Sequence, residues 1–194
     1  MNLPRFKFSY NKSEILNVIL HGGSSGIDSD FMVKIYNKFE KSNDSVVGLN
    51  FPYIDRGEED CTNDLQEELE ALESVLNIVT GFKKFKQIRF VAKSLGAIVA
   101  SHYLCDRANL DECEYLITVL GYVAGSIDLK TFPGAIKIIQ GEMDRFGGIE
   151  VVKKDMKDAI SKSIEFIEIP GVDHSYRNPE TKAPVGEGEV VSRL

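Results

Sequence analysis

One serine stands where an apolar run gives way to small residues. Ser94 follows the strand-like run 88–91, and Gly96 lies two places after it, ahead of a helix-like segment over 97–104. A strand that turns directly into a helix holds such a hydroxyl on an exposed corner, and its neighbours must be small because the two backbones nearly touch. Ala92 replaces the first glycine of the usual Gly-x-Ser-x-Gly pattern. The pattern predicts a nucleophile; the alternative is an ordinary strand-to-helix turn.

A serine nucleophile needs a base to remove its proton, and the chain has three histidines. His102 lies two helical turns beyond Ser94, so about 12 Å of helix rise carries it away from the hydroxyl. His21 ends an apolar strand, and we expect it to order its own loop. His174 follows the last expected strand in a loop that contains glycine, from which it can reach back across the sheet edge. We therefore predict that His174 is the base.

The base in turn needs an acid that fixes its tautomer. Asp144 lies in the turn after the penultimate expected strand and is our choice. Asp128, one loop earlier, is the competitor, and Glu142 lies nearer the strand end. Asp173 adjoins His174 and is badly placed to orient its neighbour's ring. The alternative for Asp144 is a structural turn or cap residue. The chain order serine, aspartate, histidine is the order of an α/β-hydrolase triad.

Acyl chemistry also needs N–H donors for the developing oxyanion. The backbone N–H of Leu95 is one candidate, because it follows the nucleophile at a helix N-terminus. The second donor is expected from the small-residue loop 21–26, where the N–H of Gly23 and that of Ser24 remain equal alternatives. A phosphate-binding role for this loop is disfavoured, because it has neither Gly-x-Gly-x-x-Gly nor a Gly-Lys-Ser/Thr ending.

Other side chains could line a substrate pocket, or could equally be core aromatics: Phe51, Tyr53, Tyr122 and Phe146. Lys93 immediately precedes the serine. The alternation of side chains along a strand directs it away from the hydroxyl, so we expect a structural place under the turn rather than a catalytic role.

Strand-like and helix-like segments alternate along the chain. Strands are expected at 6–10, 15–20, 45–49, 87–92, 114–120, 135–139 and 164–169, and helices from about 29, over the stretch ending at 81, at 97–104 and at 149–161. This order predicts one α/β domain over 1–194, a mainly parallel twisted sheet with helices on both faces. Ligands of such sheets bind beyond the C-terminal ends of the strands. The segment 176–194 is expected to be an irregular tail with at most a short helical turn.

Composition narrows the functional classes. The chain has 194 residues, 43% of them hydrophobic, and a net charge of −7. This argues against a nucleic-acid-binding surface and a polybasic membrane patch. The apolar runs are too short for a membrane span, and the N-terminus reads as a strand rather than a signal peptide. Three cysteines without a disulfide or zinc spacing indicate a reducing, cytoplasmic location.

Taken together, the motifs resemble a small, lidless α/β hydrolase, similar to the dienelactone-hydrolase-like group and its branch with a basic residue before the nucleophile. The stretches that carry the resemblance are 21–23, 50–53, 93–96, 141–144 and 173–175. The resemblance implies a triad of Ser94, His174 and Asp144. The chain departs from the family pattern at Ala92, in the short loop after Gly121, and in a tail that lacks the periodicity of a closing helix.

The sequence therefore predicts a serine hydrolase that cleaves a carboxylic ester or related acyl bond through an acyl-enzyme. The reaction would need no metal or cofactor, and its partner would be a small-molecule acyl substrate. No nucleic acid or membrane partner is expected, and a homo-oligomer is left open. The alternatives are an inactive interaction scaffold, an acyltransferase and, more distantly, a flavodoxin-like phosphate-binding protein.

Overall fold

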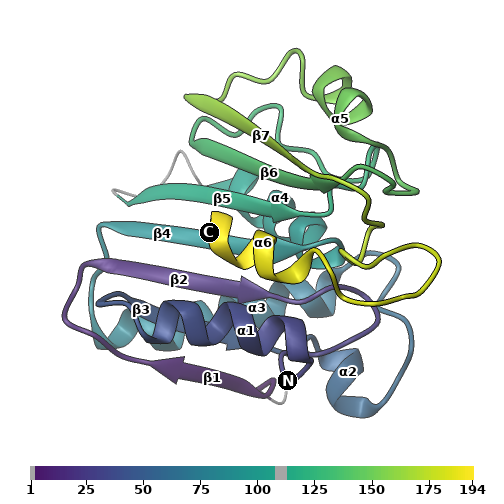
Figure 1. Ribbon diagram of the computed structural model, residues 1–194. Coiled ribbons are helices and arrows are strands. Elements are labelled where there is room, and N and C mark those ends of the chain that lie inside the picture. Colours follow the sequence, from purple (N-terminus) through teal and green to yellow (C-terminus); the bar gives the residue numbers. More distant parts are fainter. Residues whose placement is uncertain (1–2, 108–112) are drawn as a thin grey trace.

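The computed structural model describes residues 3–107 and 113–194, which form a twisted seven-stranded sheet with the order β1-β3-β2-β4-β5-β6-β7 (Figure 1). Strand β1 pairs antiparallel with β3, and the other neighbours are parallel. The strands are β1 (Phe6–Ser9), β2 (Ile15–Leu20), β3 (Ser45–Leu49), β4 (Gln87–Lys93), β5 (Glu114–Leu120), β6 (Ala135–Gly141) and β7 (Ser163–Ile169). The predicted α/β class with a mainly parallel sheet is confirmed.

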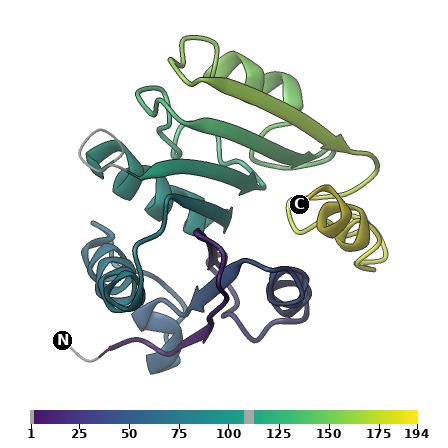
Figure 2. The ribbon, with the colours of Figure 1, turned by 90° about the vertical axis from the view of Figure 1, so that its left-hand side faces the viewer.

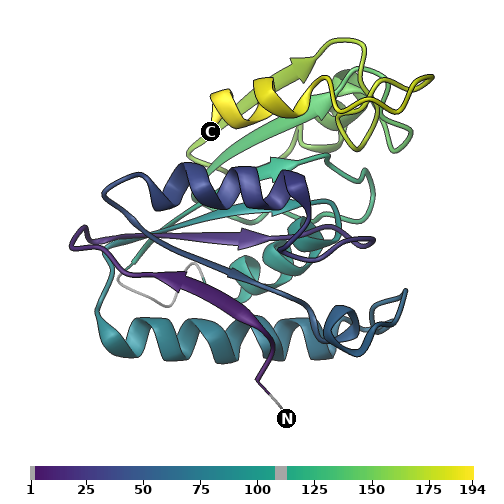
Figure 3. The same ribbon diagram turned by 60° about the horizontal axis from the view of Figure 1, so that its bottom comes forward.

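Helices cover both faces of this sheet. They are α1 (Asp30–Glu40), α2 (Pro52–Arg56), α3 (Gln66–Phe82), α4 (Leu95–Arg107), α5 (Ile149–Asp155) and α6 (Glu187–Arg193). Helices α1 and α6 lie on one face, whereas α3 and α4 lie on the other (Figures 2 and 3). The loop between β5 and β6 is short and carries no lid domain. Among the described residues, no helix has the length and apolar character needed to cross a bilayer.

Two hydrophobic clusters, one on each face, explain this layering. Leu72 and Val75 of α3 pack in the larger cluster with Phe90 of β4. Phe31 and Ile35 of α1 pack in the smaller cluster, which also takes in buried residues of the sheet and the C-terminal segment. Central strands of a parallel sheet are buried on both faces and are therefore almost continuously apolar. That burial keeps the strand ends, where the site lies, in fixed positions.

The structure differs from the sequence expectations at three helices. No helix was expected in the segment after β3, but it forms α2, which begins at Pro52 and is followed by Gly57 with a φ of 74°. This is the usual preference for proline at the start of a helix and glycine after its end. Helix α5 ends at Asp155, well before the expected 161. The tail is not irregular throughout, because α6 forms at its end.

Two backbones approach closely at the start of α4. A Cβ added to Gly96 would lie 2.6 Å from the carbonyl oxygen of His21 and 2.8 Å from Cβ of Leu20. The end of β2 is therefore packed directly against the first turn of α4, and only glycine leaves room for it. This contact explains in physical terms why the residue two places after Ser94 is small.

We predict that Gly96→Ala destabilises the protein by about 2–3 kcal/mol, because the new methyl group overpacks a backbone contact that cannot move aside. Gly81→Ala is the matched control, since a Cβ there meets nothing within 4 Å. In a helix that control change should be neutral or stabilising by up to about 1 kcal/mol. Urea unfolding measures both, and equal effects of the two substitutions would contradict the prediction.

Candidate active site

Three loops at the C-terminal edge of the sheet bring together side chains that are remote in the chain. Ser94 lies between β4 and α4, Asp144 follows β6, and His174 follows β7. Ser94 has a φ of 48°, in the left-handed region that a residue with a side chain seldom adopts. Such strain is characteristic of a nucleophile held on a sharp strand-to-helix turn.

The three side chains form a continuous hydrogen-bonded chain. Nε2 of His174 lies 2.8 Å from Oγ of Ser94, and its Nδ1 lies 2.7 Å from Oδ2 of Asp144. An ionised carboxylate only accepts hydrogen bonds, so this contact places the imidazole proton on Nδ1. Nε2 is then free to accept the hydroxyl proton of Ser94. The Asp144 side chain is fully buried and that of His174 is 12% exposed, so water is largely kept from the contact between them.

Asp144 is fixed by two further donors. Oδ1 accepts the backbone N–H of Phe146 at 2.9 Å, and Oδ2 lies 3.0 Å from Nε2 of Gln140. Gln140 is fully buried, and its Oε1 accepts the N–H of Tyr122 at 2.7 Å. The sequence analysis did not single out Gln140. Its position at the end of β6, four residues before Asp144, was the available signal.

The ring of His174 is confined on two sides. Phe146 packs edge-on against it, with 4.7 Å between ring centroids. On another side lies Gly121, whose φ is 69° and where an added Cβ would be 2.9 Å from Cε1 of the imidazole. The loop itself is anchored by Tyr176, a fully buried residue whose hydroxyl donates to the carbonyl of Ile139 at 2.6 Å. Sequence reasoning did not identify Tyr176.

His21 holds the small-residue loop rather than acting at Ser94. Its Nε2 accepts the N–H of Phe51 at 2.9 Å, and its Nδ1 lies 2.7 Å from the carbonyl of Gly22. Burial lowers the pKa of His21 to about 4, so the ring is neutral and Nδ1 carries the proton. The hydroxyl of Tyr53 donates to the carbonyl of Gly23 at 2.9 Å. These bonds fix the carbonyls of the loop.

The cavity at Ser94 holds about 390 Å³. Its walls include residues that were predicted to react, to hold the oxyanion or to line the substrate pocket: Gly23, Ser24, Ser94, Leu95, Phe146 and His174. Phe146 is therefore the one predicted pocket aromatic placed on this wall. Phe51, Tyr53 and Tyr122 are fully buried in the core, where their apolar area is better shielded from water.

The competing residues lie elsewhere. His102 is exposed on α4, and Asp128 is an exposed residue of the β5–β6 loop whose Oδ1 accepts the N–H of Lys130. Glu142 accepts the N–H of Gly171. Asp173 Oδ1 accepts backbone N–H groups of the His174 loop. Among the residues that the structure describes, no three His, Cys, Asp or Glu side chains gather as metal ligands would.

Lys93 is not packed beneath the turn as expected. Its side chain contributes to the wall of the Ser94 cavity and to that of a second, larger cavity beside it. Its Nζ would lie 3.5 Å from a Cβ added to Gly22, on the side of that loop that also faces Ser94. Strand alternation directed Lys93 away from the hydroxyl of Ser94, whereas the structure places Lys93 and Ser94 on the wall of the same cavity.

Comparisons with known proteins agree with this architecture. Residues 12–190 match the model of a family described as an alpha/beta hydrolase domain. An α/β serine hydrolase homologue from Coxiella burnetii is similar in structure, with a TM-score of 0.73, 17% identity, and coverage of 97% of this chain and 90% of that one.

Two further solved structures are also similar. A lidless serine hydrolase from Xanthomonas campestris has a TM-score of 0.72 and 16% identity, with 96% of this chain and 84% of that one covered. An esterase from Pyrococcus furiosus has a TM-score of 0.68 and 16% identity, with coverage of 97% and 84%. No match was found among curated proteins.

The neutral state of His21 predicts a pH-dependent stability. The unfolded chain takes up a proton near the ordinary pKa of 6.5, whereas the folded chain takes it up only near a pKa of about 4. The unfolded state therefore binds more protons in this window, and stability falls as the pH is lowered from about 6.5 to 4. The loss attributable to His21 is on the order of 3 kcal/mol.

Urea unfolding of the wild type and of His21→Gln across this pH window measures that loss. Glutamine can accept the Phe51 N–H but does not titrate, so the variant should lose less stability on acidification than the wild type. His21→Asn serves as a second variant if glutamine does not fit. Parallel pH profiles for wild type and variants would contradict the assignment.

Proposed function

Because the chain belongs to the alpha/beta hydrolase family, we propose that it is a serine hydrolase that cleaves a carboxylic ester or a related acyl bond. The observation that carries the proposal is the hydrogen-bonded chain from Ser94 through His174 to Asp144. Family membership favours a hydrolase in general. The ester specificity and the roles of individual residues rest on the geometry and on the chemistry that it permits.

In the first half-reaction, Oγ of Ser94 attacks the carbonyl carbon while Nε2 of His174 takes the hydroxyl proton. Asp144 stabilises the imidazolium that results. The negative charge on the carbonyl oxygen would be held by the N–H of Leu95 and by that of Gly23 or Ser24. When the intermediate collapses, the ester C–O bond breaks, and the imidazolium returns its proton to the departing alcohol.

In the second half-reaction, water replaces the alcohol. His174 takes a proton from the water as it attacks the acyl-enzyme, and the proton then returns to Oγ of Ser94 when the acid leaves. The open cavity beside Ser94, without a lid domain, suits small soluble esters. An acyltransferase would use an alcohol or thiol in place of this water, and product analysis with added acceptors distinguishes the two reactions.

The first test of this function is covalent labelling. The wild type should react with a fluorophosphonate and turn over p-nitrophenyl acetate, and Ser94→Ala should abolish both signals. Asp144→Asn should keep the fold but lower kcat by roughly 10⁴-fold, because the amide favours the wrong tautomer of His174. A folded wild-type protein that neither reacts with the probe nor turns over the ester would favour the inactive-scaffold alternative.

A second prediction concerns the positioning residue Gln140. Gln140→Leu removes a donor to the buried carboxylate of Asp144, a hydrogen bond of a kind that contributes about 1.5–3 kcal/mol. If that bond steadies the triad in the transition state, kcat should fall by about 10- to 100-fold with little change in KM.

Gln66→Leu is the control for this change, since Gln66 is exposed on α3 and its side chain donates a hydrogen bond to Glu70. It should leave kcat and KM unaltered. Thermal unfolding of both variants separates positioning from stability. A rise in KM with kcat intact for Gln140→Leu would show that the residue acts on substrate binding instead.

A further inference from the structure

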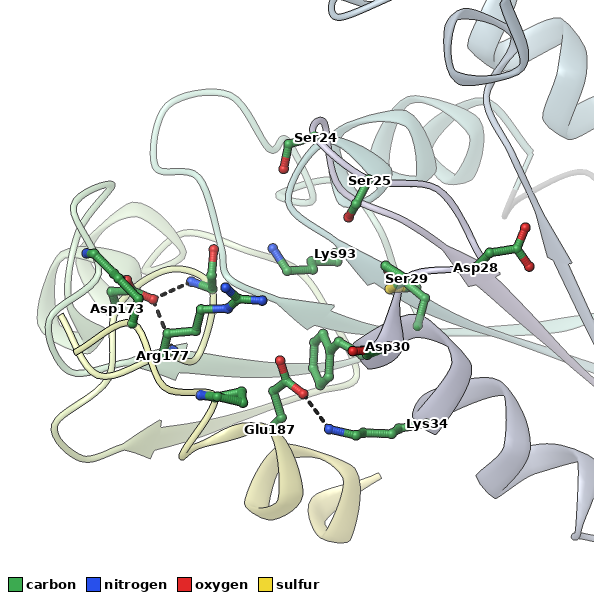
Figure 4. Close-up of a pocket in the computed structure, with 15 residues that line it drawn as sticks. Ser24, Ser25, Asp28, Ser29, Asp30, Lys34, Lys93, Asp173, Arg177 and Glu187 are labelled. Carbon is green, nitrogen blue, oxygen red and sulfur yellow. Dashed lines mark hydrogen bonds and ion pairs between the residues drawn. The ribbon is translucent and has the colours of Figure 1, made fainter. Parts of the chain in front are cut away.

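A second cavity, of about 700 Å³, adjoins the site at Ser94. One side is formed by the small-residue loop and the N-terminal end of α1, and the other by the segment that runs from the His174 loop to α6 (Figure 4). The two cavities share three wall residues, Ser24, Lys93 and Ser175. A substrate whose carbonyl lies at Ser94 can therefore extend past Lys93 into the larger cavity.

Most of the negative charge around this larger cavity is already paired. Asp28 bonds Lys7 and Arg5, at 2.5 and 2.7 Å. Glu187, which is almost fully buried, binds Lys34 at 2.7 Å. These carboxylates are neutralised by cations of the protein itself.

Asp173 is also engaged, since its Oδ1 accepts the N–H groups of Ser175 and Arg177 at 2.8 and 3.1 Å. Its Oδ2 lies 3.8 Å from Lys182. Asp30 is exposed in the first turn of α1, where negative charge complements the helix dipole. Little negative charge is thus left to pair with further cations of the cavity.

Two cations of the cavity have no ion pair or hydrogen bond to their charged groups within the described part of the chain. They are Nζ of Lys93 and the guanidinium of Arg177, and Figure 4 shows both side chains extending into the space between the cavity walls. Arg177 is an exposed residue on the C-terminal side, whereas Lys93 is largely enclosed.

The enclosure of Lys93 has an electrostatic consequence. Burial lowers the pKa of Lys93, and the nearby charge of Arg177 adds to this effect. The negative charges of Asp144, Asp173 and Glu187 partly oppose it. A largely desolvated ammonium group without a bonded anion is unfavourable. An anion bound between Lys93 and Arg177 would give Lys93 a partner and would offset the repulsion between the two cations.

We propose that this cavity is an anion subsite, in which Lys93 and Arg177 bind a carboxylate or phosphate group of the ester that Ser94 cleaves. The inference rests on the proposed hydrolase function and specifies its substrate class. Lys93 would then act as a specificity-determining residue. The lysine next to the nucleophile would thus have a role outside the triad.

The geometry also limits where the anion lies on the substrate. Nζ of Lys93 and Cβ of Ser94 are 3.5 and 3.6 Å from the same point, the position of a Cβ added to Gly22. Because both atoms lie within 3.6 Å of this point, the distance between Nζ of Lys93 and Cβ of Ser94 is less than twice 3.6 Å. The anionic group must be separated from the scissile carbonyl by only a short linker, as in the monoester of a short dicarboxylic acid.

Binding is tested first, because it does not depend on catalysis. Glutarate, inorganic phosphate and neutral glutaramide are titrated into full-length Ser94→Ala, with the backbone amide signals of cavity residues followed by NMR. At least one of the two anions should bind saturably, and glutaramide should not. The tighter of the two identifies carboxylate or phosphate as the preferred group.

The charge requirement is then tested by Lys93→Met in the Ser94→Ala background. Loss of this charge-assisted contact should weaken anion binding by about tenfold or more. Lys86→Met is the matched control, since Lys86 precedes the opposite end of β4, is 78% exposed and pairs with Glu14. The control should leave anion binding unaltered.

Kinetics test whether the subsite selects substrates. Monoethyl glutarate is compared with ethyl 4-carbamoylbutanoate, its neutral amide counterpart, by ethanol release. If phosphate binds more tightly, 2-acetoxyethyl phosphate is compared with its neutral dimethyl phosphate ester, by acetate release. The ratio of kcat/KM for the anionic ester to that for the neutral ester should fall about tenfold in Lys93→Met, by a smaller factor in Arg177→Gln, and not in Lys86→Met.

Saturable anion binding that depends on Lys93, with the expected fall in the kinetic ratio, supports the subsite. Equal binding of glutarate and glutaramide, no saturable anion binding, or a ratio unchanged by Lys93→Met overturns it. A wild type that is labelled by the fluorophosphonate but fails these tests loses the subsite and keeps the hydrolase function. Anion binding by a wild type that resists labelling overturns the hydrolase function instead.

Discussion

The close approach of backbones at the C-terminal edge of the sheet is the constraint on which the site depends. At Gly96 the end of β2 touches the first turn of α4, and at Gly121 the end of β5 leaves room for the imidazole of His174. Ser94 is held between these contacts with a φ of 48°, and its backbone N–H donates to the carbonyl of Leu120 at 3.0 Å. The surrounding sheet therefore fixes the strained backbone that presents the hydroxyl.

Two neutral polar side chains, those of His21 and Gln140, hold loops around Ser94 in place. His21 is neutral because burial lowers its pKa, and it ties the small-residue loop to the backbone at Phe51. Gln140 connects Asp144 with the backbone at Tyr122 without adding a charge beside the carboxylate. Buried hydrogen bonds of this kind are favourable only when all their partners are present. The loop of His21 therefore depends on the backbone at Phe51, and the turn of Asp144 depends on the backbone at Tyr122.

The C-terminal segment has a larger part in the site than a tail would suggest. Tyr176 is fully buried and anchors the loop of His174 beneath the sheet edge. Beyond it, the chain turns back to α6, where buried Glu187 meets Lys34 of α1. This closure forms one wall of the larger cavity, so a segment of polar composition helps to define the shape of that cavity.

The sequence by itself determined the α/β architecture and the order of the strands along the chain, because apolar strands alternate with amphipathic helices. It also selected Ser94, Asp144 and His174, since parallel strands place the residues that follow their C-terminal ends at one edge. Only the tertiary structure decided the surroundings of these residues. Gln140 and Tyr176 carry no motif, and their contacts join residues that are distant in sequence.

The surroundings of the aromatic residues and of Lys93 likewise depend on segments that are distant in sequence. Phe51 and Phe146 have the same side chain, but one is enclosed by the core and the other borders a cavity. Strand alternation predicted that Lys93 points away from the hydroxyl of Ser94, whereas both residues border the same cavity. Whether that direction leads to packed side chains or to open space depends on where α1 and the C-terminal segment lie, and no local pattern of residues records how closely two such distant segments approach.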